Sequence, residues 1–272
     1  MDPDEADVLL ALAERDFIET WSLFGRLPGA SVVDEAGVLR IVTGAPDPLA
    51  NAVLRTRIPP GRDSDAAIGA AIEATIARFD AADLPWTWWS LPSDVPGDIV
   101  ERVARRGSSA IESAPLMVLA DLDAVTPRSV AGLAVERVRD DAGIEAFLRL
   151  AEGALELTAV VGGLLRSLAG VTGLGDDAPI RHYLGRLEGE AVGIATLHLG
   201  GRVAGIYNVG TPEAFRGRGI GSALTMAALV DARASGATTA ALQSSELGLG
   251  VYRRLGFVEV GTIRAVGRAT DA

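Results

Sequence analysis

Apolar residues recur along the chain with two different periods, one typical of helices and one typical of strands. A period of three to four predicts helices at residues 4–24, 64–79, 98–106, 144–155, 161–168, 219–235 and 247–255. Shorter apolar or alternating runs predict strands at residues 38–43, 52–58, 85–92, 116–119, 133–138, 182–187, 191–199, 202–209, 238–243 and 257–266. Helices and strands are interspersed and hairpins occur, so we expect an α+β fold rather than a doubly wound parallel sheet.

The periodic pattern is interrupted over residues 121–132, which are polar and hold few regularly spaced apolar positions. A chain of 272 residues also exceeds the length of one ordinary domain. We therefore predict two domains, residues 1–125 and residues 126–272.

Composition narrows the class of protein. Apolar residues make up 49% of the chain, yet no apolar run is long enough to cross a bilayer, and the N-terminus is acidic where a secretory signal is positive. A soluble, cytoplasmic protein is expected. The net charge of −11 argues against nucleic acid or an anionic membrane as partner. It is compatible with a cationic acceptor such as an amine, although an acidic surface that serves solubility is the commoner case.

The chain has no cysteine, which removes disulfides, thiol nucleophiles and thiolate metal sites. Its histidines are His182 and His198, both on predicted strands, where packed or solvent-facing rings are the expected reading. We therefore expect no metal site.

Residues 216–223 read RGRGIGSA and stand between a strand-like run and the start of a predicted helix. Glycine lets the main chain approach a ligand closely, and the first N–H groups of a helix have no partner within it. With the charges of Arg216 and Arg218, such donors suit the phosphate oxygens of a di- or triphosphate. The stretch predicts a phosphate-binding strand–loop–helix. A glycine-rich turn that caps a helix and binds no ligand is also consistent with these residues.

Two other phosphate loops are excluded by their own requirements. A Walker loop needs a lysine after its last glycine, and this chain has no lysine. The dinucleotide fingerprint needs GxGxxG and an acidic residue at the end of the next strand. Here the spacing is GxGxG, and the next strand ends in Gln243-Ser244.

The C-terminal half, from about Leu133 to Val266, resembles the GNAT (GCN5-related) N-acetyltransferase superfamily. The segment Arg216–Gly221 matches the family's [Q/R]xxGx[G/A] element at a strand–loop–helix junction. Downstream, Tyr252-Arg253-Arg254-Leu255-Gly256-Phe257 matches its Tyr-x-x-x-Gly-Phe signature. The resemblance implies a mixed, mostly antiparallel sheet flanked by helices.

The resemblance also implies that acyl-CoA, most simply acetyl-CoA, is the cosubstrate. Its pyrophosphate would lie over the main-chain amides of the loop, and its pantetheine arm beside the strand at 206–209, where that strand splays from the strand at 238–243. Tyr252 would be the general acid for the leaving thiolate, and a main-chain N–H near Val209, after a bulge, would meet the carbonyl oxygen. The cofactor-binding residues implied are Val209, Arg216, Gly217, Arg218, Gly219, Ile220, Gly221 and Ser222.

The general base is the point at which the chain departs from the family pattern. Many members carry a glutamate on the strand ahead of the loop, but residues 203–209 hold no carboxylate, and Ser244-Ser245 replaces an asparagine often found after the next strand. Glu246 is the nearest acid in sequence and the candidate base, with helix capping as its alternative role. Glu152 and Glu156 are weaker candidates, and a chain of waters without a dedicated base is also open.

The first half shows the same order of elements as the second, which suggests a degenerate GNAT-like domain. Val103 stands where Tyr252 stands, and the loop at residues 59–65 contains prolines and two aspartates where a phosphate loop would need bare amides. All four tryptophans lie in this half. Core or interdomain packing is expected of them, and a wall of the acceptor pocket is the alternative.

The sequence therefore predicts an acyl-CoA-dependent N-acyltransferase that acts on the amine of a small molecule or peptide. Transfer should be direct, within a ternary complex, because no cysteine can hold the acyl group. A non-catalytic acyl-CoA-binding module or sensor is the main alternative, and a scaffold without ligand is a third. The acceptor's identity, the acyl chain length and the formation of a homodimer are left open.

Overall fold

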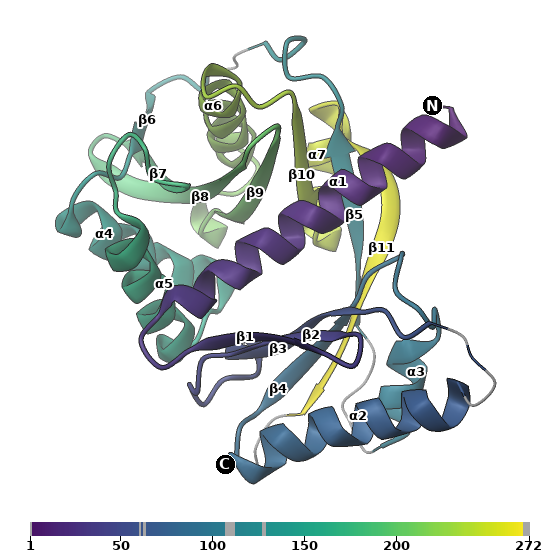
Figure 1. Cartoon of the computed structure of the whole chain (residues 1–272). Helices are drawn as coiled ribbons and strands as arrows, with labels where there is room; N and C mark the ends of the chain where they lie inside the picture. The colour runs from purple at the N-terminus through teal and green to yellow at the C-terminus, as the bar shows by residue number, and fades with distance from the viewer. Residues whose placement is uncertain (1, 60, 62–63, 107–111, 127–128, 269–272) are drawn as a thin grey trace. The chain divides into compact units, whose positions relative to one another are not determined.

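The computed structural model describes residues 2–59, 61, 64–106, 112–126 and 129–268, and it divides into two compact units (Figure 1). Unit 1 contains the chain up to Thr20 together with Leu116–Val260, and unit 2 contains Trp21–Pro115 and the residues from Gly261 on. The predicted boundary at residue 125 lies near the passage at Leu116. The two ends of the chain differ from that division. The chain up to Thr20 belongs to the unit formed by the C-terminal half, and the residues from Gly261 on belong to the unit formed by the N-terminal half.

In its described residues, unit 2 consists of a mixed β-sheet and two α-helices. Its elements are β1 (Ser31–Glu35), β2 (Val38–Val42), β3 (Asn51–Thr56), α2 (Ser64–Ala81), β4 (Trp86–Ser90), α3 (Ile99–Ala104) and the end of β11 (Val258–Arg268), with short 3₁₀ turns at Leu23–Arg26 and Pro48–Ala50. β1 was not predicted, because it is a largely exposed edge strand without an apolar face. Of the predicted loop at 59–65, residues 60, 62 and 63 lie outside the described residues.

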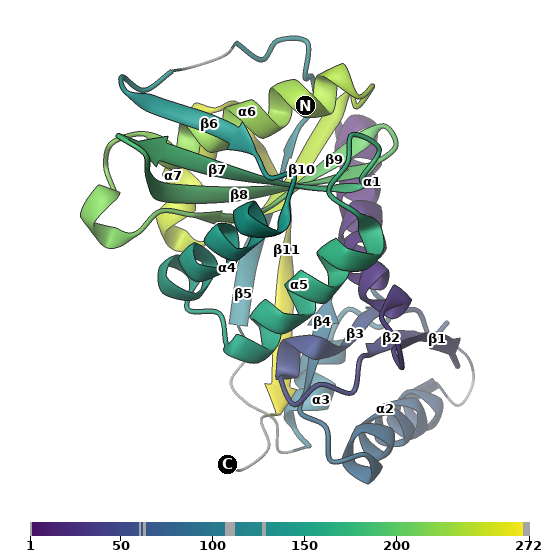
Figure 2. The same cartoon turned by 90° about the vertical axis from the view of Figure 1, so that its left-hand side faces the viewer.

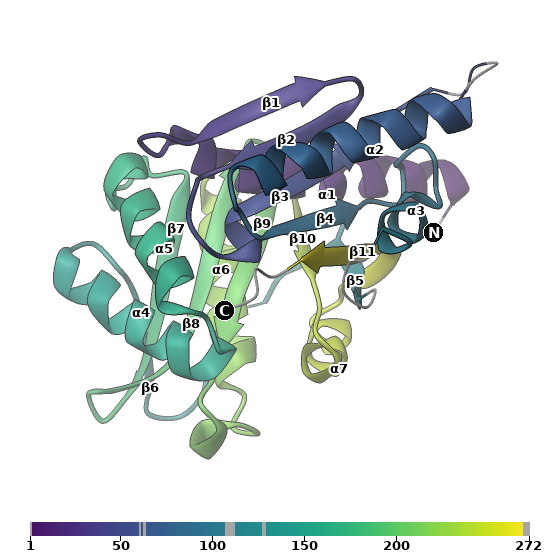
Figure 3. The same ribbon diagram turned by 90° about the horizontal axis from the view of Figure 1, so that it is seen from below.

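The strands of unit 2 follow the order β1-β2-β3-β4-β11, and only β3 and β4 run parallel, joined by α2 (Figure 3). Trp86 and Trp88 are buried in the core between this sheet and the helices, together with Phe79 and Val103. The Trp88 indole also donates to Thr56 Oγ1 (3.1 Å). The tryptophans of β4 that share one strand face thus pack the core of unit 2, as expected of them.

Unit 1 holds the remaining elements. They are α1 (Pro3–Ser22, up to Thr20), the end of β5 (Glu112–Leu119), β6 (Leu133–Arg137), α4 (Asp141–Leu155), α5 (Ala159–Thr172), β7 (Ile180–Leu187), β8 (Glu190–Gly200), β9 (Val203–Gly210), α6 (Ile220–Ala234), β10 (Thr239–Gln243), α7 (Glu246–Arg254) and the start of β11, with a 3₁₀ turn at Glu213–Phe215. These bounds lie within a few residues of those predicted from periodicity, and β11 is one long strand where strands were predicted over residues 257–266.

The sheet of unit 1 has the order β5-β10-β9-β8-β7-β6, and only β9 and β10 run parallel, joined by α6. α6 covers one face, and α4 and α5 cover the other (Figure 2). Phe147 of α4 packs on His182 of β7, and Asp16 of α1 contacts His198 of β8, so α1 shares the face of α4. The α+β fold with a mostly antiparallel sheet between helices is therefore confirmed.

The two units have the same connectivity. Each contains an antiparallel pair, then a helix that crosses to a parallel strand, and finally an antiparallel partner contributed by a strand from the other half of the sequence. In unit 1 that partner is the end of β5 beside β10, and in unit 2 it is the end of β11 beside β4. The predicted internal repeat is thus present at the level of strand order.

None of the described helices combines the length and the apolar character required to cross a membrane.

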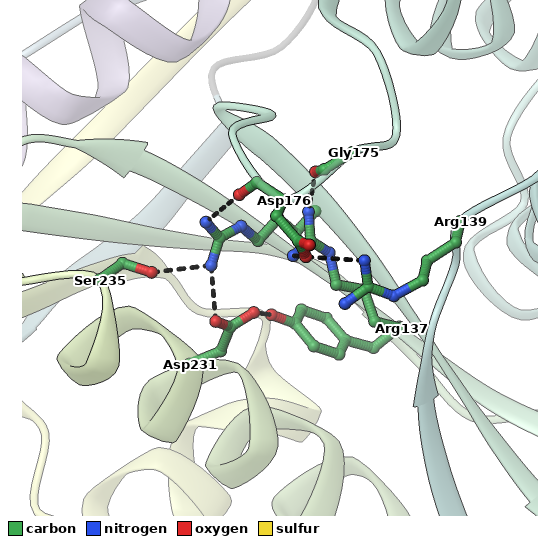
Figure 4. A network of polar contacts seen from close by, with 8 residues as sticks. Arg137, Arg139, Gly175, Asp176, Asp231 and Ser235 are labelled. Atoms are coloured by element: carbon green, nitrogen blue, oxygen red, sulfur yellow. Dashed lines mark hydrogen bonds and ion pairs between the residues drawn. The ribbon is translucent and has the colours of Figure 1, made fainter.

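A network of arginines and acids fastens α6 to the strands of unit 1 (Figure 4). The Arg181 guanidinium, almost buried, donates to Asp231 (2.5 Å) and Ser235 (2.7 Å) of α6 and to the carbonyl of Asp176 (2.7 Å). Tyr183 also donates to Asp231. Asp176, which is well exposed, binds Arg137 (3.2 Å) and Arg139 (2.7 Å). Because Arg181 is shielded from water, its pairing with Asp231 should contribute more to the stability of the fold than the exposed ion pairs of Asp176 do.

Asp231→Ala should lower the free energy of unfolding by about 2–3 kcal/mol, because it leaves the Arg181 cation without its anion. Asp176→Ala is the matched control and should cost less than about 1 kcal/mol, since its pairs are screened by solvent. Urea unfolding of both variants measures the difference, and equal losses would show that the Arg181–Asp231 pair has no special weight.

His182 gives the fold a pH dependence. The ring is buried, with Nδ1 3.0 Å from Thr196 Oγ1, and burial lowers its pKa to about 4. The unfolded chain takes up this proton near pH 6.5, so the neutral ring stabilises the fold above pH 6.5, and that contribution is lost as pH falls toward 4. Between pH 8 and pH 5 the loss should be about 2 kcal/mol. Urea midpoints across this range measure it, and His182→Asn should flatten the dependence; an unchanged slope in that variant would contradict the assignment.

Candidate active site

The sheet of unit 1 opens between its two parallel strands. β9 and β10 pair from Val203–Thr239 to Gly205–Ala241, after which β9 continues to Gly210 without its neighbour. The residues of β9 up to Ile206 are buried, whereas Tyr207, Asn208 and Val209 are partly exposed. The predicted splay of these strands is therefore present, and it leaves main-chain groups of β9 available at that end.

A bulge in β9 lies at the same place. Ile194 of β8 pairs with Gly210 and Thr196 pairs with Tyr207, so two residues of β9 stand opposite Ala195 alone. Asn208 takes the left-handed conformation (φ 49°), which asparagine tolerates better than most residues. Its side-chain amide faces Thr196 Oγ1 (3.4 Å), the atom that also contacts His182. This polar row lies at the bulge, next to Val209.

The loop after β9 ends in an unusually bare helix start. Gly217 (φ 76°) and Gly219 (φ 81°) have left-handed backbones, and Gly219 is the N-cap of α6 without any side chain to cap it. The first helical N–H that bonds back into the helix is that of Ala223, to Gly219 O (3.0 Å). Within the described part of the chain, the N–H groups of residues 220–222 donate to no main-chain carbonyl, and they face the helix start.

A cavity of about 540 Å³ connects this loop to the parted strands. It is bounded by Leu155 of α4, by the end of β9, by the loop and first turn of α6, and by α7. Of the predicted cofactor-binding residues, six line it: Val209, Arg216, Gly217, Gly219, Gly221 and Ser222. Arg218 and Ile220 are not among its lining residues. The Arg218 guanidinium lies 5.4 Å from the centre of the Phe215 ring, and the Ile220 side chain is buried in the core.

Tyr252 lines the same cavity from α7. It is nearly buried, packs edge-on against Phe257 at 5.8 Å, and burial raises its pKa to about 12. The phenol is therefore protonated at neutral pH, as a proton donor must be.

The other predicted acids do not line the cavity. Glu246 is the exposed first residue of α7, although its neighbours Ser245, Leu247 and Gly248 do line it. The capping role considered for Glu246 belongs to Ser245, whose hydroxyl accepts from the Gly248 amide (3.2 Å). Glu152 and Glu156 are exposed at the end of α4.

Sequence reasoning missed part of the cavity wall. Leu247, Val251 and Arg254 of α7 lie there, and Leu247 is 81% exposed, which is unusual for leucine. Their spacing of four and three residues, on the helix that carries Tyr252, was the available signal. Leu155 and Ala154 had no such signal, because they come from a helix far away in sequence.

Comparisons with known proteins agree with this geometry. No curated protein sequence matches the chain. Among solved structures, a GCN5-related N-acetyltransferase from Kribbella flavida matches with a TM-score of 0.74 and 21% identity, covering 94% of this chain and 95% of that one. A tandem GNAT protein from the clavulanic acid biosynthesis pathway matches with a TM-score of 0.59 and 18% identity, covering 98% and 96%. At these identities the likeness concerns the fold.

The family comparison covers the site itself. Residues 164–257 match the sequence model of the acetyltransferase (GNAT) family, a range that includes β9, the glycine-rich loop, α6, β10 and α7. Over this range the chain is similar to the acetyltransferase (GNAT) family.

Proposed function

We propose that this protein transfers an acetyl group from acetyl-CoA directly to an amine of a small molecule or peptide, within a ternary complex. The observation that carries the proposal is the single cavity that joins the bare start of α6 to Tyr252 and to the parted end of β9. These are the three places where the pyrophosphate, the sulfur and the thioester carbonyl would be bound.

The pyrophosphate would lie at the start of α6, which offers unpaired N–H groups and the positive end of the helix dipole. Arg216 lines this part of the cavity and Arg254 lines it from α7, so two guanidinium groups are available to phosphate oxygens. Arg218, held over Phe215, would act from outside the cavity.

The thioester would lie beside the bulge. A main-chain N–H near Val209, beside the polar row of Asn208, Thr196 and His182, would stabilise the negative charge that develops on the carbonyl oxygen, because a donor held by the fold needs no reorganisation during the reaction. Attack by the amine forms the C–N bond, and collapse of the intermediate breaks the C–S bond.

Tyr252 would protonate the departing sulfur, but its high pKa limits how it can do so. A thiol (pKa about 8.5) is a stronger acid than this phenol, so Tyr252 cannot be left ionised. It must receive a proton from the attacking nitrogen as it gives its own to sulfur. Tyr252 then passes one proton from nitrogen to sulfur.

The absence of cysteine supports direct transfer, since the chain has no thiol to carry the acetyl group. The absence of a carboxylate from 203–209 is what favours the second candidate, a protein that binds acyl-CoA without turnover. Glu246 stays a predicted base. Polyamines, aminoglycosides, amino acids and peptide amines all remain candidate acceptors.

Binding of the cosubstrate is tested at Gly221. A Cβ there would lie 3.6 Å from Val209 and 3.8 Å from Thr211, so a side chain fits. Gly221→Asp places a carboxylate in the first turn of α6, where it stabilises the helix but repels phosphate. Calorimetry should show roughly 100-fold weaker acetyl-CoA binding with no loss of melting temperature. Gly221→Ala is the control and should bind nearly normally; equal affinity in all three proteins would place coenzyme A elsewhere.

Catalysis is tested at Tyr252 with a panel of spermidine, kanamycin, a lysine peptide and free amino acids, measuring release of coenzyme A. Tyr252→Phe should lower kcat by roughly 100-fold or more and leave the affinity for acetyl-CoA almost unchanged. Tyr183→Phe removes another buried hydroxyl of unit 1 and should affect only stability. Tight binding of acetyl-CoA without release of coenzyme A on any amine would instead support the binding module.

A further inference from the structure

A buried polar cluster lies on the α1 face of unit 1 and joins a helix outside the segment that matches the family model to strands inside it. Asp16 of α1 is completely buried, and an ionised carboxylate only accepts hydrogen bonds. It accepts from His198 Nδ1 on β8 (2.8 Å) and from the Tyr207 hydroxyl on β9 (2.7 Å). A buried carboxylate is costly unless it is bonded in this way, so its retention needs a reason.

The sequence of β9 makes room for this carboxylate. A Cβ on Gly205 would lie 2.2 Å from Asp16 Oδ2 and 2.3 Å from the Tyr207 ring, so any larger residue would displace both. Glycine within a strand often marks such a close approach. Asp16 thus occupies the space that a side chain of β9 would fill, and it brings to that strand the carboxylate that β9 itself lacks.

Tyr207 brings the cluster to within two residues of Val209, which lines the cavity, although Tyr207 is not itself a lining residue. It is the first of the partly exposed residues before the bulge. Burial of its hydroxyl and the charge of Asp16 raise the pKa of Tyr207 well above its ordinary value. Thr20 of α1 and Gln243, the last residue of β10, interact with the same hydroxyl and offset part of this rise in pKa.

We propose that Asp16 is the proton acceptor for the amine substrate and acts through Tyr207. The inference rests on the acetyl transfer proposed above and names the base of that reaction. Tyr207 contacts the amine, and Asp16 and His198 are positioning residues behind it. The N-terminal helix would in this way complete a site whose other parts lie in the matched family segment.

The protons balance as follows. The substrate ammonium gives one proton to the Tyr207 oxygen while the Tyr207 proton passes to Asp16 Oδ2, which leaves a neutral amine with a free electron pair. That pair forms the C–N bond and the C–S bond breaks. The second proton of the nitrogen goes to sulfur through Tyr252, and Asp16 later releases the first to water.

The test compares Asp16→Asn and Tyr207→Phe with Glu19→Gln, a charge-removing control on the same helix whose acid pairs with Arg15 instead of β9. At pH 7, kcat/KM for the best amine of the panel should fall roughly 100-fold in both variants. The fall should shrink as pH rises toward the pKa of the amine, because free amine then forms without a base. His198 of β8 and Tyr207 of β9 are the titratable groups that contact Asp16, and Tyr207 stays protonated over this range.

The affinity for acetyl-CoA should be unchanged in both variants, and Glu19→Gln should behave as the wild type. The double variant of Asp16→Asn and Tyr207→Phe should be no slower than either single variant, because the two residues act in one proton path. Tyr207→Phe keeps the Asp16–His198 pair and serves if Asp16→Asn does not fold. Lower melting temperatures with an unaltered pH profile would overturn the proposal and leave Asp16 a structural clamp. A wild-type protein that binds acetyl-CoA but transfers nothing would overturn the proposed function as well, so the two failures are distinguishable.

Discussion

The site depends on one constraint, which is that β9 and β10 are parallel and pair over only a few residues. Parallel neighbours require a crossover, here α6, and the start of that helix must therefore lie near the end of β9. Once the strands part, the end of β9 keeps unpaired main-chain groups beside the unpaired N–H groups of the helix. A sheet with full pairing would have neither the cavity nor donors directed into it.

The position of α1 follows from a second constraint, the need to satisfy a buried carboxylate. Asp16 bonds to residues 182 and 191 positions later in the chain, and these contacts help to place the N-terminal helix with the C-terminal sheet in unit 1. The same contacts explain why a boundary drawn from sequence order alone differs from the compact units. The order of elements in the sequence does not show that α1 belongs to unit 1. It also does not show that β5 and β11 each begin in one unit and end in the other.

Local features were predictable and distant pairings were not. The glycine-rich loop, the Tyr252 signature and the helix periods all come from short stretches whose meaning does not depend on what they contact. Arg218 and Ile220 show the limit, since both belong to the motif but their side chains face Phe215 and the core. Asp16 looked like one more acid on an amphipathic helix. A glycine at position 205 within a strand indicated a close approach by another group. The sequence did not indicate that this group is Asp16.

The two tyrosines proposed to act in the reaction raise the same chemical question. Burial lifts the pKa of each above its ordinary value, so neither can hold a negative charge during turnover at neutral pH. A tyrosine of this kind serves catalysis only when it gains a proton as it loses one. Tyr252 can do so between nitrogen and sulfur, both within the reaction. Tyr207 needs a further acceptor behind it, and a carboxylate that is buried, bonded and seated against β9 is the acceptor that this fold holds in place.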